Sequence, residues 1–233
     1  IKDDVIKKII RSYTKEAGVR ELERKIATII RKIVTSIVEK RILMNKYIID
    51  AKKVEQFLGK PKYANYSDSA TGIGVVNGLA YTNYGGDILP IEVTYFKGNG
   101  ELVLTGSLGE IMKESALIAL NYIKTNHKKF GIKYDDLIKN DIHIHVPEAA
   151  IPKEGPSAGI TLTTAIISAF TKLKIPKNIA MTGEITLRGN VLPIGGLKEK
   201  SIGALRVGIK KIIIPETVTT IGEGAFKNSG LTT

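Results

Sequence analysis

The chain has 233 residues, of which 43% are hydrophobic and 25% are charged, as is ordinary for a globular protein. It contains no cysteine, which excludes disulfides, zinc–thiolate sites and cysteine nucleophiles. No apolar run approaches the roughly 20 residues that span a bilayer, so we expect no membrane partner. The first residues, "IKDDVIKKII", show neither a signal-peptide core nor an initiating methionine, and we expect a fragment of a longer protein.

The formal net charge is +12, and residues 1–58 contribute +7 of it through 15 Lys and Arg against 8 Asp and Glu. A basic excess can steer a protein onto nucleic-acid phosphates. Here, however, the basic residues are mixed with acidic ones along predicted helices, and few aromatic residues lie among them for base stacking. We therefore favour a solvated helix surface and keep a nucleic-acid-binding module as an alternative.

Residues 1–59 predict a small all-helical unit. Apolar residues recur at helical spacing over 4–13 and over 19–43, with Gly18 between the two stretches. "YIIDAKKVEQFLG" predicts a short strand, an N-cap at Asp50 and a last helix that ends at Gly59. The next stretch, residues 60–72, is rich in Pro, Ser, Asp and Gly without an apolar period, which predicts a linker.

The pattern changes after the linker, and residues 73–215 predict a mixed α/β domain. Three β-rich runs, "GVVNGLAYT", "DILPIEVTYF" and "ELVLTG", precede a long helix over about 108–126. There follow a strand in "DIHIHVP", a buried helix over 156–173, a strand in "NIAMTG", a hairpin over 184–195 that turns at Gly189–Asn190, a helix over 196–208 and a strand over 210–215.

One serine, Ser157, stands among small or rigid residues in "IPKEGPSAG", which keep the approach to its hydroxyl clear. Ser157 is therefore a candidate nucleophile, and the alternative is a serine that only caps the following helix. A nucleophilic serine needs a base, for which His127 at a basic helix end is better explained as a C-cap. His143 and His145 share one face of a strand, a spacing that needs a third ligand to hold a metal, and we expect none.

A buried lysine is the other base known for serine, because burial disfavours the charged form and lowers the pKa. The candidates are Lys198 and Lys200 in "PIGGLKEKSIGA". Two residues apart on a helix, their side chains point about 200° apart, so one faces inward when the other faces solvent. The apolar spacing around them does not decide which lysine is inside.

At these residues the chain resembles the Lon family of ATP-dependent serine proteases. "PKEGPSAG", "AMTGEITLRGNVLPIGGLKEK" and "TGSLGEIMKESA" resemble the Lon proteolytic domain, and "YTKEAGVRELERKIATIIRK" resembles the end of the small helical subdomain of the Lon AAA+ module. The likeness runs from about residue 1 to about residue 215. It implies a Lon-type α/β proteolytic domain preceded by a small all-helical AAA+ subdomain fragment.

The resemblance also implies roles for individual residues. Ser157 falls on the family's nucleophile, Lys200 on its general base, and Thr182 on the threonine that hydrogen-bonds the lysine amine. Backbone N–H groups around Ser157 would then stabilise the oxyanion of an acyl-transfer reaction. Arg20 matches the sensor-2 arginine, which reaches the nucleotide in the family. The alternative for Arg20 is an exposed helix arginine paired with Glu16 or Glu23.

Full-length relatives use ATP and magnesium to unfold polypeptide substrates and thread them to the protease. This chain shows no G-x-x-x-x-G-K-[ST] phosphate loop, so we expect it to use no cofactor and to hydrolyse no ATP by itself. The resemblance further implies degradation of unfolded or damaged proteins, a homohexameric ring, nonspecific contact with DNA, and the bacterial cytoplasm or alternatively the mitochondrial matrix.

The chain departs from the family pattern in two regions. Around the site, Glu154 replaces the common Asp, Ala149 and Ile151 replace Gly and Thr, and Ser201 and Gly203 stand where larger or more helix-favouring residues are usual. Gly203 should weaken its helix by about 1 kcal/mol relative to Ala. Residues 216–233 resemble a single leucine-rich repeat, which cannot bury its own apolar face. An inactive or unassembled Lon fold is therefore the alternative to an active peptidase.

Overall fold

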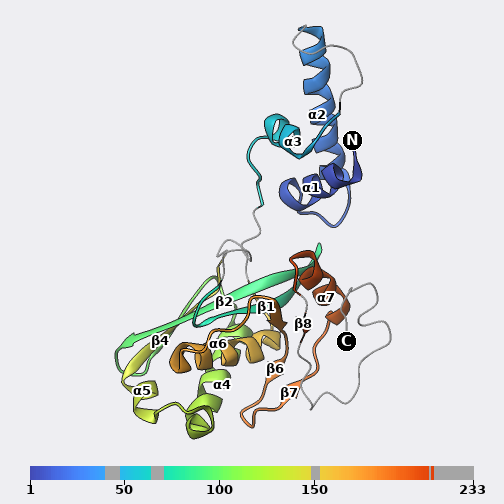
Figure 1. The fold of residues 1–233 in the computed structure, drawn as a ribbon. Helices are drawn as coiled ribbons and strands as arrows, with labels where there is room; N and C mark the ends of the chain where they lie inside the picture. The colour runs from blue at the N-terminus through green and yellow to red at the C-terminus, as the bar shows by residue number, and fades with distance from the viewer. Residues whose placement is uncertain (40–47, 64–70, 148–152, 210, 213–233) are drawn as a thin grey trace. The chain divides into compact units, whose positions relative to one another are not determined.

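The computed structural model describes residues 1–39, 48–63, 71–147, 153–209 and 211–212, and Figure 1 labels its elements. The chain divides into two compact units, Ile1–Asn65 and Tyr66–Thr233. Within the described residues no helix is both long enough and apolar enough to cross a membrane.

The first unit consists of α1 (Asp3–Tyr13), α2 (Arg20–Val38) and α3 (Ala51–Leu58). Its core is formed by the side chains of Val5, Ile9, Tyr13, Ile29, Ile49, Val54 and Phe57. The predicted N-cap is confirmed, because the Asp50 side chain accepts a hydrogen bond from the Lys53 N–H at 2.9 Å. Gly59 ends α3 with φ at 83°. The all-helical unit predicted from the sequence is thus confirmed.

Two details of that prediction differ from the structure. Residues 48–50 form no strand, because the described part of this unit offers no second strand to pair with and Ile49 packs among the helices instead. Helix α2 ends at Val38, with Glu39 as its C-cap. The remainder of the predicted helix, residues 40–43, lies outside the described residues.

The second unit is built on a six-stranded mixed sheet of order β3-β4-β2-β1-β5-β8. Its strands are β1 (Val75–Thr82), β2 (Gly85–Lys97), β3 (Leu102–Thr105), β4 (Asn140–His145), β5 (Ile179–Met181) and β8 (Lys211–Ile212). Strands β1, β2 and β4 pair antiparallel, while β3 joins β4, β5 joins β1, and β8 joins β5 in parallel. The mixed α/β class is therefore confirmed.

Helices cover both faces of this sheet. On one face α6 (Gly159–Thr171) packs against β1 and β2, and α4 (Glu110–Thr125) packs against α6 (Figure 1). Gly78 of β1 faces α6, since a Cβ there would lie 3.3 Å from Thr161 Oγ1. The next residue, Leu79, points to the opposite face, where it clusters with Ala204 of α7 (Leu197–Arg206). Helices α6 and α7 therefore lie on opposite faces.

The remaining elements are short. The 3-10 turns η2 (His127–Phe130) and η3 (Pro156–Ala158) follow α4 and precede α6, and α5 (Tyr134–Ile138) leads into β4. The predicted hairpin exists as β6 (Glu184–Ile185) paired with β7 (Val191–Leu192). Its turn is not the predicted two-residue one. The loop spans residues 186–190, closed by a hydrogen bond from the Thr186 N–H to the Asn190 carbonyl at 2.9 Å, and Gly189 takes φ at 84° within it.

Candidate active site

Ser157 lies in η3, between a turn at Gly155 and the start of α6. Gly155 has φ at 110°, which favours glycine, and Pro156 supplies the fixed φ of a first helical turn. The Ser157 carbonyl accepts a hydrogen bond from the Gly183 N–H at 2.7 Å, and the Gly183 carbonyl accepts one from the Ile160 N–H at 3.0 Å. The N-cap interpretation of Ser157 is wrong, because Gly155 and Ala158 occupy the cap positions of η3 and α6.

Lys200 reaches Ser157 from α7. Its Nζ donates hydrogen bonds to Ser157 Oγ and to Thr182 Oγ1, each at 3.1 Å. Thr182 follows β5, and its hydroxyl also lies 3.4 Å from the Ser157 carbonyl oxygen. Lys200 is 3% exposed, whereas Lys198 is exposed, so the inward lysine that spacing left undecided is Lys200. The structure thus brings together three of the four predicted site residues.

Burial lowers the pKa of Lys200 from 10.5 to about 8, because the charged form loses hydration. Desolvation alone produces this lowering, without a contribution from a charged neighbour. At pH 7 about a tenth of such lysines are neutral, against about 0.03% for an exposed lysine. Only the neutral amine has a lone pair that can accept the proton of a serine hydroxyl. The geometry and the burial therefore both suit Lys200 to act as a base toward Ser157.

Lys153 and Glu154, which precede Ser157, form hydrogen bonds with the residues just before α4 and in its first turn. The Lys153 N–H donates to the Ser107 carbonyl at 3.0 Å, and the Lys153 carbonyl accepts from the Gly109 N–H at 2.8 Å. The Glu154 carboxylate accepts from the Ile111 N–H in the first turn of α4 at 3.0 Å. A Cβ on Gly109 would lie 1.5 Å from Glu154 Oε2, so a side chain at 109 would displace this carboxylate.

The family models and relatives identify this arrangement. The sequence matches the model of the Lon protease (S16) C-terminal proteolytic domain over residues 48–221 and that of the Lon protease AAA+ ATPase lid domain over residues 1–46. The chain belongs to the Lon protease family. The family and the serine-peptidase fold predicted from its motifs are therefore confirmed.

Among Lon proteases, the chain is 58% identical to that of Mycoplasma mycoides subsp. mycoides over 214 residues, 56% to that of Aster yellows witches'-broom phytoplasma over 217, and 52% to that of Clostridium acetobutylicum over 215. These matches cover 91%, 93% and 92% of this chain and 27% of each relative. The chain thus spans about a quarter of the length of the curated Lon proteases that it matches.

The two Lon family models and the packing divide the chain at different places. The lid model ends at residue 46 and the proteolytic model begins at residue 48. In the structure, however, α3 packs with α1 and α2, so the first compact unit continues to Asn65. Most of the predicted linker over 60–72 and all of the predicted tail over 216–233 lie outside the described residues, and the proteolytic model reaches residue 221.

The structure explains three of the departures from the Lon pattern, at Glu154, Ser201 and Gly203. The longer Glu154 side chain reaches across Gly109 to the N-terminus of α4, a contact that the sequence alone did not indicate. Ser201 is fully buried and its hydroxyl donates to the Lys198 carbonyl at 2.8 Å, and Gly203 is also buried. Larger residues would therefore not fit at either position. Two further departures, at 149 and 151, lie outside the described residues.

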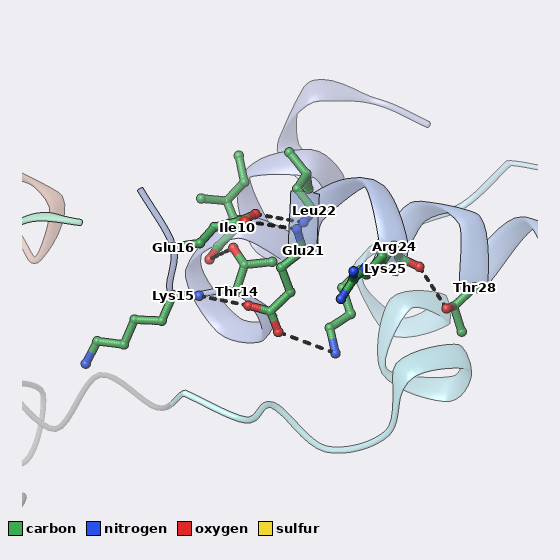
Figure 2. A network of polar contacts seen from close by, with 9 residues as sticks. All are labelled: Ile10, Thr14, Lys15, Glu16, Glu21, Leu22, Arg24, Lys25 and Thr28. Carbon is green, nitrogen blue, oxygen red and sulfur yellow. Dashed lines mark hydrogen bonds and ion pairs between the residues drawn. The ribbon is translucent and has the colours of Figure 1, made fainter. Parts of the chain in front are cut away.

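Arg20, the predicted sensor-2 residue of the lid, is an exposed residue in the first turn of α2. Figure 2 shows the turn that leads into this helix. The Glu16 carboxylate accepts hydrogen bonds from the N–H groups of Glu21 and Leu22, each at 2.9 Å, and these bonds lower the pKa of Glu16. A backbone hydrogen bond from Arg20 also lowers the pKa of Glu16, whereas within described residues 1–39 the Arg20 side chain forms no ion pair with Glu16 or Glu23. The carboxylate at 16 instead satisfies backbone donors at the start of α2.

The hydrogen bonds of the three histidines go to groups other than the Ser157 hydroxyl. His143 and His145 share a face of β4, as predicted, and Thr105 Oγ1 bridges them at 2.9 Å from His143 Nε2 and 2.7 Å from His145 Nδ1. His127 falls in η2 beyond the end of α4, and its Nδ1 lies 2.9 Å from the Ile132 carbonyl. Among the described residues no three His, Asp or Glu side chains gather in a geometry that could hold a metal.

Proposed function

We propose that this chain is the peptidase part of an ATP-dependent protease and that it hydrolyses peptide bonds with Ser157 as nucleophile and Lys200 as general base. The observation that carries the proposal is the 3.1 Å contact between Lys200 Nζ and Ser157 Oγ at a buried lysine. Membership of the Lon protease family supports it. Thr182 is the supporting residue, since its hydroxyl holds Nζ from a second direction.

The reaction proceeds in two proton-coupled steps. Neutral Lys200 takes the proton from Ser157 Oγ while Oγ bonds to the peptide carbonyl carbon, and the resulting ammonium gives that proton to the departing amine nitrogen as the C–N bond breaks. A water molecule then attacks the acyl-enzyme, again losing its proton to Lys200. The proton returns to Oγ, and a carboxylic acid is released. Backbone N–H groups around Ser157 would stabilise the oxyanion in both steps.

The cleavage experiment compares the parent chain with three variants on a fluorogenic peptide between pH 6 and 10. Ser157→Ala and Lys200→Ala should each lose at least about a thousandfold in kcat/KM, because nucleophile and base act as a unit. Lys198→Ala is the matched control, since this exposed lysine lies two residues away, and it should retain parental activity. Parental activity in Lys200→Ala would show that another group is the base.

The wider role follows from the relatives that share the proteolytic domain. Intact, about four times longer proteins of this kind would use ATP and magnesium in their AAA+ module, with Arg20 near the nucleotide, to unfold damaged polypeptides and deliver them to Ser157. We propose a cytoplasmic homohexamer, and sedimentation velocity of the chain tests its assembly, since a species that stays monomeric at high concentration argues against it. Basic residues of α2 are interspersed with acids, as in the ion pair of Lys25 with Glu21 at 3.9 Å, which favours a solvated surface over a nucleic-acid site.

A further inference from the structure

The tip of the β1–β2 hairpin contacts the backbone of α7 directly beneath the catalytic lysine. Strands β1 and β2 are joined at Thr82 and Gly85, and Gly86 begins the part of β2 that α7 covers. A Cβ on Gly86 would lie 1.9 Å from the Glu199 carbonyl oxygen and 2.9 Å from the Lys200 Cα. Real Cβ atoms do not approach so closely, so the chain at 86 and the helix backbone touch with no side chain between them.

The contact is reciprocal. A Cβ on Gly203, one turn after Lys200, would lie 2.4 Å from the carbonyl carbon of Gly86. At the start of the helix, Gly196 adopts φ at 68° and sits against Tyr81, whose Cβ would lie 3.3 Å from a Cβ on Gly196. Gly196 also accepts the first helical hydrogen bond of Lys200, from the Lys200 N–H at 2.9 Å. The close approaches at Gly86, Gly203 and Gly196 thus fix the distance between α7 and the sheet.

We propose that the hairpin tip sets the depth of the general base, with Gly86 and Gly203 as positioning residues for Lys200. This inference rests on the proposed peptidase function. Neither glycine touches the reacting atoms, and both act only through the backbone of α7. The reason lies in the geometry of Nζ, which must stay 3.1 Å from both hydroxyls while its stem stays sealed from water.

A side chain at either glycine would lift α7 from the hairpin. Restoring an ordinary carbon–oxygen separation at Gly86 requires a displacement of roughly 1.5 Å. The flexible lysine stem can extend to follow Ser157, but the gap beneath the helix admits water to a lysine that is now 3% exposed. Because burial is what lowers its pKa, hydration should raise that pKa.

The test measures the titration of Lys200 in the full chain without relying on cleavage. Acetylation by limiting acetic anhydride is followed at each pH by mass spectrometry, and the midpoint of Lys200 labelling is compared between the parent, Gly86→Ala and Gly203→Ala. We expect an upward shift of about one pH unit or more in both variants. Peptide cleavage should show the same shift in its pH midpoint, with about a tenfold loss at pH 7.

Gly195→Ala is the matched control, because a Cβ there meets nothing within 4 Å and the residue precedes the same helix. Its labelling midpoint should equal the parental one. Tyr81→Ala serves if the glycine variants do not fold, since it removes the ring carbons that lie against Gly196 without adding bulk, and it should shift the midpoint in the same direction. A folded glycine variant with the parental midpoint would overturn the proposal, and so would an unchanged Tyr81→Ala if neither glycine variant folds.

These outcomes are separable from failure of the proposed function. If the parent chain cleaves no peptide but its Lys200 titrates low and moves up in the variants, the positioning role stands without the peptidase. If Lys200 of the parent titrates like an exposed lysine, both the base assignment and the positioning role are overturned. Thermal unfolding of each variant, measured in parallel, separates a lifted helix from a lost fold.

Discussion

Burial of Lys200 leads to a stability prediction: the same desolvation that suits this lysine to its proposed role as a base should destabilise the fold. Folding lowers the pKa of Lys200 from 10.5 to about 8, and at pH 7 the folded chain still holds most of this lysine in its charged form. Desolvation of this buried ammonium group therefore lowers the stability of the folded state. Lys200→Met keeps an apolar stem and removes the charge, so we expect it to raise the free energy of unfolding of the second unit while abolishing cleavage.

The magnitude follows from the pKa change and the two contacts of Nζ. A lowering of roughly 2.5 pKa units corresponds to about 3.5 kcal/mol, at about 1.4 kcal/mol per unit. Methionine loses the hydrogen bonds to Ser157 and Thr182, each worth about 1 kcal/mol. The expected net stabilisation at pH 7 is therefore about 1.5 kcal/mol.

The sign of the effect changes with pH. Between about pH 8 and pH 10.5 the unfolded chain keeps a proton on Lys200 that the folded chain has released, so unfolding takes up a proton and the stability of the parent rises with pH. The desolvation penalty is full below about pH 8 and vanishes as the pH rises through 10.5. There only the lost hydrogen bonds remain, and Lys200→Met becomes the less stable chain.

Urea unfolding followed by tryptophan fluorescence measures this. The chain has no tryptophan, so Phe96→Trp on β2, at a side chain 49% exposed, reports on the second unit in every variant. Lys198→Met is the exposed control and should change the free energy of unfolding by less than about 0.5 kcal/mol. A Lys200→Met chain that is less stable than the parent at pH 7, or whose advantage does not fall with pH, would refute the reasoning.

Three further predictions concern the site and the first unit. Cleavage should rise about tenfold per pH unit up to about pH 8 and level off above it, and a flat pH–rate profile between pH 6 and 8 would remove Lys200 as the base. Gly109→Ala drives a Cβ into Glu154 and should lower kcat/KM about tenfold, part of which Glu154→Ala in the same chain restores; strictly additive losses would contradict their contact. Asp50→Ala removes the N-cap of α3 and should destabilise the first unit by about 1 kcal/mol in circular dichroism, with the tryptophan signal of the second unit unchanged.

Motifs and periodicity predicted the elements of this chain well because most of them bury one face. The apolar spacing of α1 and the β-rich run of β1 identify those elements, and an Asp before α3 identifies its cap. The failures arose where tertiary contacts decide. The short strand expected before Asp50 needed a partner that the described part of the helical unit does not supply, and the hairpin turn widened around the left-handed conformation of Gly189.

The candidate site was predictable in its residues but not in its packing. Ser157 and Lys200 could be assigned from the resemblance, whereas helical spacing could not choose between Lys198 and Lys200, because the face that α7 buries is set by the hairpin beneath it. For the same reason the sequence identified Gly203 only as a residue that weakens its helix. A glycine selected for close backbone approach and one that is merely tolerated look alike in a single sequence.

The covering of the sheet on both faces has a consequence for the order in which the enzyme matures. The nucleophile precedes α6 on one face, the base is carried by α7 on the other, and they meet beyond the end of β5, 43 residues apart in sequence. During synthesis Ser157 is therefore made 43 residues before Lys200. Until α7 docks on the far face, Lys200 cannot reach the Ser157 hydroxyl, so the pair forms only when both faces of the sheet are covered.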